Sequence, residues 1–161
     1  MGEMIKVGMA DLNVCHAPDA ITTLGLGSCV GVALYDKSTK IAGLVHVMLP
    51  DSTSVRQNQN PAKFADTGIV LLLQKMKQSG ANTSALTAKI AGGAQMFAFK
   101  SNNDMLRVGD RNVEAVKKKL NELRIPIIAE DTGLNYGRTV EFFPETGDFV
   151  IKAVGKPVQT I

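Results

Sequence analysis

The sequence predicts an α/β layered sandwich that contains a mixed β-sheet. Short runs of β-branched and small apolar residues stand at both ends of the chain, and two segments between them show helical periodicity. The order strands, helix, strand, helix, strands is typical of folds in which helices cover a sheet. A chain of 161 residues that is 45% hydrophobic and 20% charged also has the size and composition of one globular domain. We therefore expect residues 1–161 to form a single domain.

Four strands are predicted before residue 50. Turn signals separate four runs that favour extended structure: residues 7–15, 20–26, 29–35 and 41–48. The polar turn at 36–39 joins the last two runs, which predicts a hairpin. In a hairpin the start of one strand lies beside the end of the other. Cys29 opens the first of these strands and His46 closes the second, so we expect the two residues to meet if their side chains share a face.

Two helices and four further strands are predicted in the remainder. A polar loop over 50–61 precedes a helix over 63–78, which Ser79 and Gly80 end. Its apolar residues fall on one face: Ala65, Ile69, Leu72, Leu73 and Met76. A second helix is expected over 111–123, with Asp110 as its N-cap and an apolar stripe formed by Val113, Val116, Leu120 and Leu123. Strands are expected over 86–90, 125–129, 139–143 and 149–154.

Charge and hydropathy exclude several classes of function. The net charge is +3, and the basic run Lys117–Lys119 lies in a helical pattern without interleaved aromatic residues. A solvated helix face explains this run better than nucleic-acid binding. The longest apolar run, 69–73, is too short to cross a membrane, and no signal peptide is apparent. We therefore expect a cytoplasmic protein with reduced cysteines, and the Cys and His spacing predicts no zinc site.

Cysteine chemistry is the leading functional hypothesis. Cys29 ends a glycine-rich turn, and a thiol needs a nearby base such as an imidazole to become a nucleophile at neutral pH. We expect Cys29 to attack a carbonyl carbon while His46 takes the thiol proton and passes it to the leaving group. Backbone N–H groups in the turn, at Gly27 and Ser28, could stabilise the resulting oxyanion. Thr23, six residues before Cys29, could orient the imidazole, and Asp51 is the acidic rival for that role.

Other readings of the same residue types are weaker. Cys15 and His16 are adjacent on a predicted strand and should point to opposite faces, so they are a poor catalytic pair. The pair Gly92–Gly93 matches neither common phosphate-loop spacing, and a tight turn or close packing explains it better. Met96 and Phe97 follow it and could be exposed as a docking patch, although packing in the core is the more ordinary role for such residues.

The sequence resembles the CheD family of bacterial chemotaxis over nearly its whole length. The resemblance is carried, in order along the chain, by the segments TLGLGSC at 23–29, GLVHVMLPD at 43–51, KFADT at 63–67, IAGGAQMF at 90–97, RNV at 111–113 and GRT at 137–139. It implies a three-layer α/β sandwich related to deamidating bacterial toxins, without metal or cofactor. It also implies a Cys-His-Thr triad at Cys29, His46 and Thr23.

The resemblance implies a protein-glutamine deamidase. Such an enzyme converts glutamines on the cytoplasmic helices of chemoreceptors, the methyl-accepting chemotaxis proteins, to glutamate through a thioester and releases ammonia. The resemblance further implies binding and stimulation of CheC, the phosphatase of phosphorylated CheY, for which residues 92–97, including Gly93, Met96 and Phe97, are our candidate surface. Two alternatives stay open: a non-catalytic docking regulator of receptors and CheC, and hydrolysis of glutamyl methyl esters.

One position departs from the family pattern. Paired glycines commonly follow the residues that correspond to Asp131 and Thr132, but here Gly133 is followed by Leu134. A turn that needs a positive φ at position 134 would tolerate leucine poorly. The departure concerns the geometry of this loop and leaves the triad unaffected.

Overall fold

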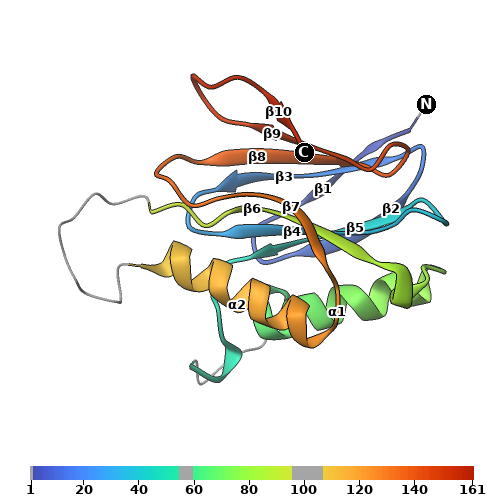
Figure 1. Cartoon of the computed structure of the whole chain (residues 1–161), viewed down its shortest axis with the longest axis horizontal. Coiled ribbons are helices and arrows are strands. Elements are labelled where there is room, and N and C mark those ends of the chain that lie inside the picture. The colour runs from blue at the N-terminus through green and yellow to red at the C-terminus, as the bar shows by residue number, and fades with distance from the viewer. Residues whose placement is uncertain (1, 55–59, 96–106) are drawn as a thin grey trace.

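The chain forms three stacked layers, two β-sheets and one layer of helices (Figure 1). The computed structural model describes residues 2–54, 60–95 and 107–161. The first sheet has the order β1 (Met4–Val7), β3 (Ala20–Leu26), β8 (Arg138–Phe143), β9 (Asp148–Lys152) and β10 (Gln159–Thr160). The second has the order β2 (Leu12–His16), β5 (Ile41–Val47), β4 (Val30–Asp36), β6 (Thr87–Gly92) and β7 (Ile127–Thr132). The helices are α1 (Ala65–Gln78) and α2 (Val108–Glu122).

The predicted three-layer α/β sandwich is confirmed, with the strands divided between two mixed sheets. In each sheet one pair of strands is parallel, β1 with β3 and β6 with β7, and the other pairs are antiparallel. The second sheet lies in the middle, between the first sheet and the helices (Figure 1). Both of its faces are therefore covered.

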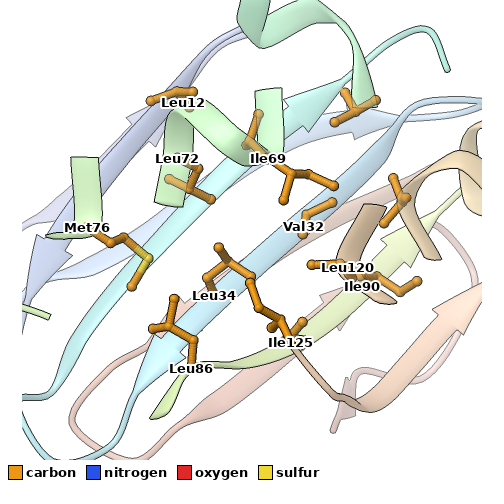
Figure 2. Close-up of a cluster of buried hydrophobic side chains, with 14 of the residues drawn as sticks. Leu12, Val32, Leu34, Ile69, Leu72, Met76, Leu86, Ile90, Leu120 and Ile125 are labelled. Atoms are coloured by element: carbon orange, nitrogen blue, oxygen red, sulfur yellow. The ribbon is translucent and has the colours of Figure 1, made fainter. Parts of the chain in front are cut away.

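Two apolar cores hold the layers together. The helix-side core lies between the helices and the second sheet, where Ile69, Leu72 and Met76 of α1 and Leu120 of α2 pack against side chains such as Val32 and Leu34 (Figure 2). The intersheet core lies between the two sheets and includes Ile21, Ala33, Leu44, Val140, Phe142 and Phe149. Every residue of β4 and β5 is buried, because each strand contributes alternate side chains to the two cores.

Several predicted boundaries are corrected by the structure. The expected strand over 7–15 is two strands, because a turn with Ala10 at φ +53° carries the chain from the first sheet to the second. Asp110 is not an N-cap: α2 begins at Val108, and Arg107 precedes it without a capping side-chain bond. Asp110 lies in the first turn, where its charge still favours the positive end of the helix dipole. The short strand β10 was not predicted.

The basic run on α2 is a solvated helix face, as predicted. Lys117 pairs with Glu130 of β7 at 3.0 Å, and Lys119 pairs with Glu122 at 2.9 Å. Within the described part of the chain, no helix has the length and apolar composition needed to cross a bilayer.

The predicted hairpin of β4 and β5 is closed by a buried aspartate. Asp36, fully buried, accepts hydrogen bonds from Ser38, Thr39 and the backbone N–H of Asn82, which follows α1. Burial by itself would raise the pKa of this carboxyl, but these bonds outweigh it and lower the pKa to about 2. The ionised side chain thus ties the turn, and with it the hairpin register, to the helix layer.

We predict that Asp36→Asn lowers the free energy of unfolding at neutral pH by about 2 kcal/mol, because bonds to a buried charge are lost. The folded-state pKa lies below the ordinary value of 3.8, so the contribution is present above pH 3.8 and disappears as the pH falls to about 2. Urea unfolding measured from pH 7 to pH 2 checks both statements. Asp51→Asn, which alters an exposed carboxylate that caps Thr53, is the control and should cost less.

In the loop between β7 and β8, position 134 has the positive φ that leucine tolerates poorly. Leu134 has φ +61° and its side chain is 62% exposed, so leucine holds a left-handed backbone without compensating burial. The loop is otherwise well anchored, since the Leu134 carbonyl accepts from the N–H of Gln95 at 2.8 Å.

Leu134→Gly should therefore raise the free energy of unfolding by about 0.5–1 kcal/mol, the relief of left-handed strain less the added entropy of the unfolded chain. Thermal or urea unfolding measures the change. Leu134→Ala removes the same exposed side chain but keeps Cβ, so it should give no such gain. Equal stabilisation by both substitutions would mean that the exposed side chain, not the backbone, is the cause.

Candidate active site

Two residues of the predicted triad lie at or beside strand ends of the second sheet, and the third, Thr23, lies in the middle of a strand of the first sheet. Thr23 is on β3 of the first sheet, His46 is next to the last residue of β5 in the second, and Cys29 directly precedes β4. All three are buried, with exposed fractions of 2%, 0% and 9%. The space between the sheets at this end of the sandwich is therefore the candidate site.

The hairpin register places Cys29 and His46 on the same face. His46 lies directly across from Gly31, and the ladder ends one pair further at Val30 and Val47. Side chains two residues apart on a strand share a face, so Cys29 lies on the face of Gly31 and His46. That face is the one covered by the first sheet, because Cys29 and Ala33 belong to the intersheet core. The sharing of a face, which the sequence analysis left as a condition, is thus met.

Thr23 reaches His46 across the gap between the sheets. Its Oγ1 lies 2.7 Å from Nδ1 of His46 and 2.8 Å from the carbonyl oxygen of Val7 on the neighbouring strand β1. Both contacts are buried. A hydroxyl has one proton, and the Val7 carbonyl can only accept, so the Thr23 proton is donated to Val7. Thr23 must then accept from Nδ1–H of His46.

This hydrogen bond determines the tautomer of the imidazole. With the proton on Nδ1, the neutral ring carries its lone pair on Nε2. Nε2 is buried and has no hydrogen-bond partner among the described residues, so it is not bonded to the Cys29 thiol. A buried nitrogen without a partner is costly to stability, which makes it a mark of function. The arrangement leaves an oriented base on the face that Cys29 shares.

Burial keeps both reacting groups neutral at rest. It lowers the pKa of His46 below the ordinary value of 6.5. It also raises the pKa of Cys29 above the ordinary value of 9.0, an effect that the backbone N–H of Cys29 itself partly opposes. Both shifts favour the neutral forms, a thiol and an imidazole.

The turn before Cys29 offers backbone donors, though not at every predicted position. The N–H of Gly27 donates to the carbonyl of Gly25 at 3.1 Å, and the Gly27 carbonyl accepts from the N–H of Ala94 at 2.8 Å. The N–H groups of Ser28 and Cys29 find no acceptor on other residues in the described part of the chain. The N–H of Gly27 is thus occupied within the turn, whereas those of Ser28 and Cys29 are not bonded to other described residues; the oxyanion role of Gly27 and Ser28 stays a prediction.

The Gly92–Gly93 pair supports the backbone of Cys29, in line with the expected packing role. The N–H of Gly93 donates to the Cys29 carbonyl at 2.8 Å. Gly92 has φ +111°, and a Cβ there would collide with that same carbonyl oxygen, so only glycine fits. Gly93 is buried against Val113 of α2, whereas the other predicted docking residues, Met96 and Phe97, lie outside the described residues.

The rival residues lie apart from this site. Asp51 accepts from the backbone and hydroxyl of Thr53, both at 2.8 Å, and lines a cleft of about 440 Å³ in the helix layer. Cys15 is buried on β2 while the adjacent His16 is exposed, so the two do not form a pair. Burial and, secondarily, the charge of Asp19 raise the pKa of the Cys15 thiol to about 12.

One further residue at the site, Asn112 of α2, was not predicted from the sequence. Its side chain is fully buried, and Nδ2 donates to the carbonyls of Ser28 at 2.9 Å and Met48 at 3.0 Å. A signal was present in the sequence. Asn112 stands four and eight residues before Val116 and Leu120, so a polar residue occupies a position on the apolar stripe of the helix.

Comparisons with known proteins agree with the resemblance noted in the sequence. A family model described as "CheD chemotactic sensory transduction" matches residues 48–153. A protein of Lachnoclostridium phytofermentans named "Probable chemoreceptor glutamine deamidase CheD" is 70% identical over 161 residues, the whole of both chains. Proteins of Halalkalibacterium halodurans and Bacillus licheniformis named "Chemoreceptor glutamine deamidase CheD" are 60% and 52% identical, and the matches cover 96% and 98% of this chain and 96% and 95% of theirs.

We predict that Thr23→Val shifts His46 away from the tautomer protonated on Nδ1, because the hydrogen-bond acceptor for Nδ1–H is lost. Nitrogen-15 NMR of the imidazole reports the tautomer directly, and His16→Gln identifies the His46 signals. Thr23→Ser keeps the hydroxyl and should keep the wild-type pattern. In wild type the neutral ring should persist as the pH falls below 6.5, since burial lowers the pKa of His46. An unchanged tautomer in Thr23→Val would refute the assigned hydrogen bond.

Proposed function

This chain belongs to the CheD family, and from that premise and the geometry of its site we propose that it is a cysteine-dependent deamidase of glutamine side chains on chemoreceptors. The observation that carries the proposal is the buried bond between Thr23 and His46. It leaves Nε2 as a base on the face that holds the Cys29 thiol. The names of its relatives supply the substrate: chemoreceptor glutamine.

Acylation begins when a glutamine carboxamide enters beside Cys29. The sulfur attacks the amide carbon while Nε2 of His46 takes the thiol proton, so a neutral pair becomes a nucleophile and an imidazolium. Thr23 accepts from Nδ1–H throughout and stabilises the positive ring. The N–H groups of Ser28 and Cys29, which are not bonded to other described residues, would donate to the oxyanion that forms. Nε2–H then protonates the amide nitrogen, ammonia leaves, and a thioester remains.

Deacylation uses the same groups in reverse. Water takes the position that ammonia has left, Nε2 removes its proton, and the oxygen attacks the thioester carbon. When the C–S bond breaks, the glutamate side chain is released and the thiol regains its proton from His46. The steps release ammonia and a protonated glutamate side chain, which exchange a proton in solution to give ammonium and carboxylate. Within the site, each proton transfer runs through Nε2 of His46.

The substrate class depends on where chemoreceptors expose glutamine side chains. We propose that the cytoplasmic helices of methyl-accepting chemotaxis proteins offer their surface glutamines to this end of the sandwich. Two large apolar side chains on loops or strands next to the site, Leu24 at 60% and Leu134 at 62%, are exposed and available for contact with a helix. By family resemblance the proposal extends to CheC, which would be bound and stimulated through the same part of the surface.

The test is mass spectrometry of a chemoreceptor cytoplasmic fragment after incubation with wild type and with Cys29→Ala. We expect amide-to-acid conversion at defined glutamines, with release of ammonia, by the wild type alone. Cys15→Ala is the matched control and should remain active, because Cys15 lies on β2 opposite Ala42, four residues before His46. Methanol release from methylated fragments would instead favour the esterase alternative.

The same variants separate catalysis from docking. Cys29→Ala should bind receptor fragment and CheC about as well as wild type, since the substitution removes one buried sulfur and no exposed contact. If folded, reduced wild type converts no glutamine but binds these partners, the docking regulator replaces the deamidase as the function.

A further inference from the structure

The site contains a buried side chain that no step of the proposed reaction uses. Asn112 is fully buried, and its Nδ2 donates to two carbonyls from different parts of the chain. One belongs to Ser28, the residue before Cys29. The other belongs to Met48, two residues after His46. Both partners are carbonyls, so the atom that faces them must be the NH₂ group of the amide. One nitrogen therefore holds the backbone on the thiol side to the backbone on the imidazole side.

This link lies just beyond the last cross-strand pair of the β4–β5 hairpin. The last cross-strand pair of β4 and β5 is Val30 with Val47. Beyond it the backbone groups bind elsewhere: the Cys29 carbonyl accepts from Gly93, and the N–H of Met48 donates to the carbonyl of Lys63. In the described structure the hydrogen-bonded link across this fork is the Asn112 amide. The Asn112 amide therefore takes the place of the next backbone hydrogen bond between the two strands. It does so beside the residues that carry the thiol and the imidazole.

The helix that carries Asn112 is seated against the same turn. At Gly109 an added Cβ would collide with the carbonyl oxygens of Ala94 and Gly93, so the first turn of α2 lies directly on this segment. That segment in turn holds Cys29 and Gly27 through the N–H groups of Gly93 and Ala94. Helix α2, which carries Asn112, is thus packed on the segment that hydrogen-bonds to the backbone of Cys29.

The other end of the Asn112 side chain shows that stability alone does not explain the residue. Its Oδ1 is buried and has no hydrogen-bond partner among the described residues. An unpaired buried acceptor opposes the gain from the two donated bonds. The Asn112 side chain gains two hydrogen bonds but leaves its own oxygen without a partner. A role in positioning the two backbone segments that it links accounts for this arrangement.

We propose that Asn112 is a positioning residue for the thiol and imidazole. It acts by holding the Ser28 and Met48 backbones together, and with them the two segments that carry Cys29 and His46. This inference rests on the proposed function for its kinetic consequence, but its geometric part concerns the thiol and imidazole alone.

The test compares Asn112→Asp and Asn112→Ala with Val116→Ala, which truncates a fully buried residue one turn later on the same helix without touching the site. Ammonia release from a receptor fragment gives kcat and KM, urea unfolding gives stability, and peptide mass spectrometry gives the rate of Cys29 alkylation by iodoacetamide. We expect both Asn112 variants to lose about 100-fold in kcat with little change in KM, because misplacement affects the reaction more than binding. Cys29 alkylation should slow in both variants.

Val116→Ala should keep its kcat and its alkylation rate even where it is destabilised as much as the Asn112 variants. Because the Ala variant introduces no charge, slowed alkylation there excludes a direct effect of a new carboxylate on the thiol. Equal losses in Val116→Ala at matched stability, unchanged kcat in the Asn112 variants, or failure of both variants to fold would each overturn the proposal in favour of a structural role. If the wild type deamidates no receptor fragment, the proposed function fails, and the alkylation comparison decides the role of Asn112 by itself.

Discussion

Burial of the second sheet on both faces is the constraint on which the site depends. Every residue of β4 and β5 is enclosed, with alternate side chains in the helix-side core and the intersheet core. A slip of one residue would exchange the two sets, so the register is strongly specified. That register puts His46 opposite Gly31 and Cys29 on the same face. The buried Asp36 at the closed end of the hairpin adds a polar anchor to the same alignment.

The first sheet supplies what the hairpin lacks, a partner for the imidazole. Buried polar groups need hydrogen bonds, and the Thr23 hydroxyl meets this need twice, as donor to Val7 and as acceptor from His46. The imidazole is satisfied once, at Nδ1, and its Nε2 is left without a protein partner in the described structure. Burial lowers the pKa of His46 and raises that of the Cys29 thiol, so both groups favour their neutral forms and the proton stays on the sulfur in the free protein. Stability has been given up at the atom where chemistry is proposed.

The helix layer acts on the site through backbone groups. Gly92 and Gly93 hold the Cys29 carbonyl, Gly109 seats α2 on that segment, and Asn112 joins the two diverging ends of the hairpin. A deamidase that must accept a glutamine from a protein surface needs a preorganised nucleophile at an accessible edge. Support from the helix layer holds the turn from the side away from the first sheet.

The sequence alone was enough to predict the element order, the hairpin, and the candidate nucleophile and base, from turn residues, periodicity and residue type. Comparison with the family pattern also drew attention to Leu134. These features depend on neighbours along the chain. The tertiary structure decided the division of strands between two sheets, the turn that splits the expected first strand, and the loss of Asp110 as an N-cap. It also decided the contact of Thr23 with His46 and the tautomer that results. The same holds for the hydrogen bond from Asn112 to Ser28, a residue 84 positions away in the chain. Such contacts depend on how the layers stack. The periodicity within one strand or helix does not indicate which layer will cover that element.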